Sequence, residues 1–130
     1  MPLVPCPSRK AGFTLIELLV VLAIIATLLT LAAPRYFQHV QRSKEAVLRE
    51  NLATLREAID QYHADKGQWP ESLHALAEAR YLRQVPRDPV TDRDDTWVEV
   101  PPPAEAAAGV FDVKSGAEGV AGDGTPYGEL

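Results

Sequence analysis

Few side chains in this sequence could do chemistry, and most of them stand apart from one another. His39, His63 and His74 lack the short spacings at which metal ligands recur, and no Gly-x-Ser-x-Gly nucleophile motif is present. The acidic run over residues 92–95 is typical of a solvated turn before a strand. We therefore expect no catalytic site and predict that the protein is not an enzyme.

One ionisable side chain stands where a charge is costly. Glu17 lies near the start of an apolar stretch, and no charged residue follows it from Leu18 to Ala33. Counted from Phe13, the stretch has about 21 residues, which is enough to cross a bilayer as a helix. A carboxylic acid inside a membrane costs roughly 2.5 to 3.5 kcal/mol and normally has a partner or a function. Glu17 therefore requires an explanation.

Charge is distributed unevenly along the 130 residues. Arg9 and Lys10 precede the apolar stretch with no acid to offset them, so the positive-inside tendency predicts a cytoplasmic N-terminus and an exported remainder. The whole chain holds 13 basic and 18 acidic residues, which argues against a nucleic-acid partner. The single cysteine, Cys6, lies before the stretch, so the exported part has no thiol with which to form a disulfide.

Two interpretations of the N-terminus are open. In the first, it is a secretory signal peptide cleaved near Leu31-Ala32-Ala33, which leaves Glu17 unexplained and needs an unusually long apolar region. In the second, the chain is cut after Gly12 and the apolar helix stays on the mature protein. Lipid attachment at Cys6 fails because no apolar region precedes that residue.

The stretch from Gly12 to Glu17, Gly-Phe-Thr-Leu-Ile-Glu, resembles the processing motif of type IV pilins and type II secretion pseudopilins. The resemblance implies that a prepilin peptidase cuts between Gly12 and Phe13, methylates the new N-terminus of Phe13 and leaves the hydrophobic helix in place. It divides the chain into a cleaved leader (1–12), a transmembrane and assembly helix (13–34) and a periplasmic head (35–130) that includes the amphipathic half of the helix.

The resemblance also suggests assembly roles for Phe13, Glu17 and Pro34. A cut before Phe13 would create an ammonium group at the helix start. Glu17 lies close to it, in a position where the helix dipole favours an anion by roughly 0.3 to 1 kcal/mol. In a filament of the kind that the resemblance implies, Glu17 pairs with the Phe13 amine of a neighbouring subunit and sets the axial register. Pro34 frees the carbonyl of Thr30, near the hydroxyls of Thr27 and Thr30. We expect either a kink at Pro34 or a simple exit from the membrane.

Beyond Pro34 the resemblance implies an α+β, type IV pilin-like fold, in which the long N-terminal helix packs on a small C-terminal antiparallel sheet. The sequence pattern predicts that this helix ends at about Asp65 and that a short helix runs from Pro70 to about Tyr81. It predicts strands over Thr96–Val100 and Val110–Val113. The apolar stripe expected to face the head core consists of Leu48, Leu52, Leu55, Ile59 and Tyr62.

The head is similar to that of the major pseudopilin of type II secretion over segments 61–70, 86–89 and 112–119. Such pseudopilins typically hold calcium in the C-terminal loop, and the resemblance carries this role onto Ser115, Glu118 and Asp123. The usual later aspartates are missing, because residues 125–130 read Thr-Pro-Tyr-Gly-Glu-Leu. Calcium takes six to eight oxygen ligands, so an ordinary acidic turn remains the alternative to a calcium site.

These features together predict a structural subunit of a type II secretion pseudopilus. The resemblance implies a helical homopolymer, built with minor pseudopilins after prepilin peptidase processing, on an inner-membrane assembly platform with its ATPase. The subunit would cross the inner membrane once, with its N-terminus in the cytoplasm and its head in the periplasm. The alternatives are a type IV pilin, a DNA-uptake (competence) pilus subunit and, in another class, an exported soluble binding module.

Overall fold

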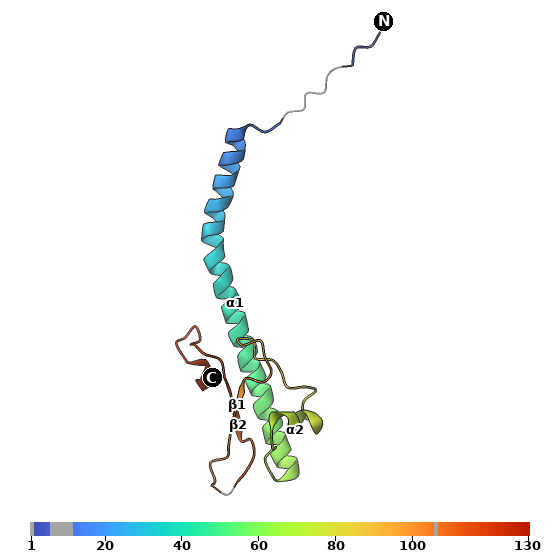
Figure 1. Ribbon diagram of the computed structural model, residues 1–130, viewed down its shortest axis with the longest axis vertical. Coiled ribbons are helices and arrows are strands. Elements are labelled where there is room, and N and C mark those ends of the chain that lie inside the picture. The colour runs from blue at the N-terminus through green and yellow to red at the C-terminus, as the bar shows by residue number, and fades with distance from the viewer. Residues whose placement is uncertain (1, 6–11, 106) are drawn as a thin grey trace. The chain divides into compact units, whose positions relative to one another are not determined.

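A computed structural model describes residues 2–5, 12–105 and 107–130 of the chain (Figure 1). Its elements in chain order are helix α1 (Leu15–Lys66), helix α2 (Leu73–Glu78), strand β1 (Trp97–Val100), strand β2 (Asp112–Ser115) and the short 3₁₀ helix η1 (Tyr127–Glu129). The chain forms two compact units, Met1–Gln38 and His39–Leu130. The basic leader residues Arg9 and Lys10, and Cys6, lie outside the described residues.

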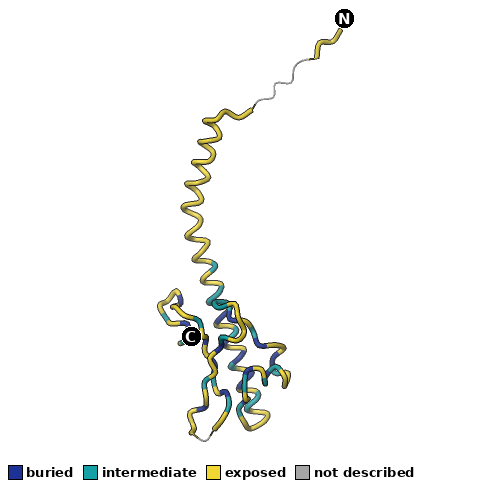
Figure 2. The backbone as a smooth tube through the Cα atoms, viewed as in Figure 1, coloured by how far each residue is buried: buried dark blue, intermediate teal, exposed yellow. Residues whose placement is uncertain are grey.

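Among its described residues, the first unit has no buried core. Every residue from Gly12 to Gln38 is exposed, including the apolar side chains of α1 (Figure 2). By length and composition α1 contains one segment able to cross a membrane, with a mean hydropathy of 2.7 and none of it buried. Apolar surface of this extent is unfavourable in water, so this part of α1 needs lipid or other protein around it.

Pro34 lies inside α1. The hydroxyl of Thr27 donates to the Ala23 carbonyl and that of Thr30 donates to the Ala26 carbonyl, each at 2.8 Å. Neither hydroxyl therefore donates to the Thr30 carbonyl, which Pro34 leaves without its amide donor. The reason is that a helical threonine hydroxyl reaches back to the preceding turn.

The second unit is built around the C-terminal half of α1. Leu48, Leu52, Leu55 and Ile59 are all buried, and Tyr62 packs against the same core, as the apolar stripe predicted. The helix ends at Lys66, one residue later than expected, where Gly67 takes a φ of 70° and donates its amide to the His63 carbonyl. The core is completed from the rest of the head by Leu73, Leu76, Leu82, Val85, Trp97, Val110, Val113, Ala121 and Tyr127.

Strands β1 and β2 form a two-stranded antiparallel sheet whose register runs from Trp97 opposite Ser115 to Val100 opposite Asp112. The first strand begins one residue later than predicted, and the second lies two residues further along the chain. Val110 is buried without joining the ladder, because its amide donates to the Pro70 carbonyl at 2.8 Å. The α+β fold with a small antiparallel sheet is therefore confirmed.

Helix α2 is shorter than predicted. It begins after Ser72, whose hydroxyl accepts a hydrogen bond from the Ala75 amide at 3.2 Å. It ends at Glu78, and two residues later Arg80 takes a left-handed φ of 65°. Leu73 and Leu76 are buried as expected, and Tyr81 lies edge-on to Tyr62 with ring centroids 5.5 Å apart.

Candidate functional site

The segment before α1 presents an accessible peptide bond. Gly12, Phe13 and Thr14 are exposed and precede the first helical residue. A Cβ built on Gly12 would meet no atom of the described residues within 4 Å. The described part of the fold therefore places no steric demand for glycine there. Peptidases act on exposed backbone outside helices and strands, which is the state of the bond between Gly12 and Phe13.

Thr14 fixes the start of the helix. Its hydroxyl accepts a hydrogen bond from the Glu17 amide at 3.3 Å, and its carbonyl accepts one from the Leu18 amide at 3.2 Å. Threonine followed three residues later by glutamate is the sequence signature of a capping box. The sequence analysis missed this role of Thr14, although the Thr-Leu-Ile-Glu spacing could have revealed it.

Glu17 lies in the first turn of α1, on the exposed apolar unit. Within the described part of the chain, its carboxylate makes no hydrogen bond and no ion pair. Its position at the helix start places the negative charge where the helix dipole favours it. The carboxylate is therefore available to a cation from outside the described residues or from another molecule.

Arg56 joins three parts of the head. Its Nε donates to Asp112 Oδ1 at 2.9 Å, and one terminal nitrogen donates to the carbonyls of Val113 and Leu130 at 3.0 and 2.8 Å. The contact links α1 to β2 and to the C-terminal turn. Arg56 was not singled out from the sequence, because partners 56 to 74 residues away leave no local signal.

A second, more exposed set of contacts ties α1 to the C-terminal loop. Arg49 forms an ion pair with Asp123 at 3.3 Å, and a Glu45 carboxylate oxygen accepts the Gly122 amide at 2.7 Å. The Thr125 amide and hydroxyl, followed by the Arg49 guanidinium, hold the pKa of the Asp123 carboxyl below its usual value.

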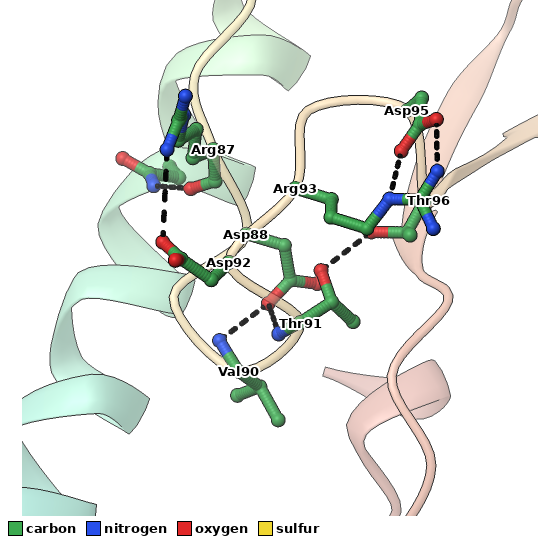
Figure 3. A network of polar contacts seen from close by, with 9 residues as sticks. Arg87, Asp88, Val90, Thr91, Asp92, Arg93, Asp95 and Thr96 are labelled. Carbon is green, nitrogen blue, oxygen red and sulfur yellow. Dashed lines mark hydrogen bonds and ion pairs between the residues drawn. The ribbon is translucent and has the colours of Figure 1, made fainter.

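The buried polar pair of the head is Asp88 and Ser115. Asp88 Oδ1 accepts the amides of Val90 and Thr91, while Asp88 Oδ2 accepts the Ser115 hydroxyl at 2.5 Å. Figure 3 shows the carboxylate of Asp88 turned into its own loop, with Arg93 and Asp95 paired beside it. The acidic run over residues 92–95 is exposed, in agreement with a solvated turn.

The residues proposed for calcium are engaged differently. The Ser115 hydroxyl donates to Asp88, the Asp123 carboxylate accepts from Arg49 and Thr125, and Glu118 is exposed. Across residues 2–5, 12–105 and 107–130, no three His, Cys, Asp or Glu side chains are grouped so as to hold a metal. Because calcium needs six to eight oxygens, this donor set as placed does not fit the ion.

The three histidines take part in no metal-ligand group within the described part of the chain. His39 and His74 are exposed, whereas His63 stacks on Trp69 with ring centroids 3.7 Å apart. His63 Nδ1 is buried without a hydrogen-bond partner in the described part of the chain.

Comparison with known proteins gives a consistent result. The family described as "Prokaryotic N-terminal methylation motif" matches residues 7–33. Fimbrial protein EcpC of Eikenella corrodens is 42% identical over 81 residues, which cover 58% of this chain and 53% of that protein. Type II secretion system core protein G of Klebsiella pneumoniae is 29% identical over 98 residues, which cover 63% of this chain and 70% of the relative.

Coverage differs between the relatives. The chain spans about half the length of the fimbrial protein and about two thirds of the core proteins G of Klebsiella pneumoniae and Aeromonas hydrophila, the latter 26% identical. No solved structure matches the chain significantly. In its methylation motif, the apolar helix that follows it and its α+β head, the chain is similar to the core protein G of type II secretion and to type IV pilins.

Proposed function

We propose that this protein is a structural subunit of a type II secretion pseudopilus. The observation that carries the proposal is the arrangement at residues 12–17: an exposed bond after Gly12, a helix capped by Thr14, and Glu17 with no partner in the described part of the chain. The relatives that carry the type II secretion name cover 63% and 62% of this chain, which is more than the methylation motif at residues 7–33 alone, and this supports the proposed function.

Processing follows from the first part of that arrangement. A prepilin peptidase would cut between Gly12 and Phe13, and methylation would leave the Phe13 nitrogen positively charged. An added Cβ at Gly12 would meet no described atom within 4 Å, so a requirement for glycine at this position would have to come from outside the fold of this chain. Recognition by the peptidase supplies such a reason.

Assembly follows from the second part. Glu17 of one subunit would pair with the Phe13 amine of a neighbour, which compensates for placing a carboxylate in an apolar environment. The exposed apolar surface of residues 13–34 would lie in the inner membrane before assembly and against other subunits afterwards. Pro34, inside the helix, would allow the backbone to adjust at this contact.

The remaining parts of the proposal concern partners and location. The subunit would polymerise with itself and with minor pseudopilins, on an inner-membrane assembly platform with its ATPase. Its N-terminus would lie in the cytoplasm and its head in the periplasm. No role in catalysis is proposed, and the relatives bear the names of pilins, fimbrial proteins and secretion core proteins.

The deciding experiment is the mature N-terminus, measured by intact mass and sequencing of membranes from cells that contain a prepilin peptidase. The proposal expects a methylated Phe13 start in the wild type and an uncut chain in Gly12→Val. Thr14→Ser, which keeps the capping hydroxyl, is the matched control and should be processed normally. A soluble product beginning near Pro34 would instead establish a secretory signal peptide and remove the proposal.

Assembly is tested with Glu17. Glu17→Ala and the isosteric Glu17→Gln should both be processed at Phe13 and both fail to form filaments, because each lacks the negative charge. Normal yield and order from either variant would refute the pairing.

A type IV pilin is the second candidate, favoured by the 42% identity to the fimbrial protein of Eikenella corrodens. Long fibres on the cell surface at native expression, with no loss of protein secretion on deletion, would establish it. A pseudopilus predicts the reverse of both results.

A further inference from the structure

The face of α1 that points away from the head core carries charges of both signs. Counted from Arg42 in steps of four and three residues, a row of side chains follows one side of the helix, and every member is exposed. The buried residues Leu48, Leu52, Leu55 and Ile59 occupy the opposite side. We call this row the outer ridge; it consists of Arg42, Ala46, Glu50, Ala53, Glu57 and Asp60.

The signs are segregated along the outer ridge. Arg42 stands at its N-terminal end, and Glu50, Glu57 and Asp60 follow toward the C-terminal end. None of these four side chains takes part in an ion pair or side-chain hydrogen bond within residues 12–105 and 107–130. By contrast, the next two arginines of α1, Arg49 and Arg56, are paired with Asp123 and Asp112 inside the head.

We infer that the outer ridge is an interaction surface for a second copy of this chain. The second copy lies parallel to the first and is shifted along the helix axis, so that Arg42 of one copy meets Glu50 or Glu57 of the other. The shift is about 12 Å for Glu50 and about 22 Å for Glu57, from a rise of 1.5 Å per residue. The inference rests on the proposed function, in which copies stand parallel because each is anchored through its own N-terminal helix.

Charge complementarity identifies the occupant. Two parallel copies without a shift would place Arg42 beside Arg42 and the acids beside the acids, which is repulsive. When the second copy is shifted along the helix axis toward the N-terminal end of the first, the acidic half of its outer ridge lies against Arg42 of the first copy. Ala46 and Ala53 lie between the charges and allow a second helix to approach closely.

The shifted contact also determines the kind of assembly. The contact joins Arg42 of one copy to the acidic half of the outer ridge of the next. A row of copies therefore always has an unpaired Arg42 at one end and an unpaired acidic half at the other. Such a heterologous contact does not close on itself by symmetry and can repeat to form an open filament. Glu17 sets one contact near the helix start, and the outer ridge would set a second within the head.

Charge reversal tests this in the full-length chain, in cells with the assembly system, by the yield of sedimentable filaments relative to processed subunit in the membrane. Arg42→Glu, and separately Glu50→Lys with Glu57→Lys, should each lower the yield several-fold. All three substitutions in one chain should restore the yield, because every copy then presents both reversed patches. Arg83→Glu and Glu78→Lys, which reverse charges off the outer ridge, are the matched controls and should assemble normally.

The outcomes separate the two proposals. If the wild type begins at Phe13 and forms filaments while the ridge variants behave like the controls, the outer ridge is not an interface and the proposed function stands. The outer ridge is likewise excluded as an interface if the combined variant assembles no better than the partial ones. If the wild type is neither cut at Phe13 nor polymerised, the proposed function fails and the inference fails with it.

Discussion

Replacement of Arg56 by alanine should unfold the head at a markedly lower temperature. The side chain makes one ion pair, with Asp112, and two charge-assisted hydrogen bonds to the backbone carbonyls of Val113 and Leu130. Arg56 and Asp112 are only 37% and 34% exposed, so water replaces these contacts incompletely. Counting roughly 1 kcal/mol for each contact, with allowance for partial exposure, gives a loss of roughly 2 to 3 kcal/mol.

The matched control is Arg49→Ala. Arg49 forms an ion pair of similar type with Asp123, but at 3.3 Å and with the two side chains 54% and 56% exposed. Exposed pairs contribute little to stability, because water and salt screen them. At about 4 to 8 °C per kcal/mol for a domain of this size, Arg56→Ala should lower Tm by roughly 10 to 20 °C, and Arg49→Ala should lower it by less than half as much.

Thermal unfolding of the full chain in detergent, followed by tryptophan fluorescence, measures both effects. Trp69 and Trp97 belong to the head and Trp97 is buried, so the signal reports the head and not the apolar part of α1. Equal Tm values for the two variants would refute the reasoning, because exposure and contact number would then not decide the stability. Arg56→Lys should recover less than half of the loss, since an ammonium group cannot reproduce the planar fork of the guanidinium.

Two further predictions concern the C-terminal loop. The pKa of Asp123 is lowered in the folded head, so its contribution to stability is present above the ordinary aspartate pKa and is lost as pH falls through the lowered value. Asp123→Asn should therefore reduce Tm at pH 7, and the difference from the wild type should shrink as the pH falls below the ordinary aspartate pKa. Because Arg49 and Asp88 engage the oxygens of Asp123 and Ser115, Tm should be the same in calcium and in chelator, and a calcium-dependent rise in Tm would show that the loop rearranges around the ion.

The sequence predicted the parts of the fold that repeat at short range. The period of the apolar residues placed Leu48, Leu52, Leu55 and Ile59 on the buried side of α1, and all four are buried. Alternation located β1 to within one residue, whereas β2 was misplaced. Val110 satisfies the same alternation but bonds to Pro70 instead of joining the sheet.

The contacts that hold the head together could not be predicted in this way. Arg56 reaches Leu130 across 74 positions, and Asp88 reaches Ser115 across 27. Nothing near either residue in the sequence marks its partner, because these pairings depend on how the loops close over α1. The capping role of Thr14 is different, since its signal was local and was overlooked.

The position of the Thr14 cap has a consequence for how processing would act on the subunit. Thr14 lies on the C-terminal side of the bond between Gly12 and Phe13, and its hydrogen bonds run forward to Glu17 and Leu18. Removal of the leader would therefore take away none of the groups that start the helix. From Thr14 onward the precursor and the mature chain would share one secondary structure. The mature chain would lose Arg9 and Lys10 with the leader and gain an ammonium group at Phe13, next to the helix start, so maturation would create the charge that Glu17 pairs with and would not refold the helix.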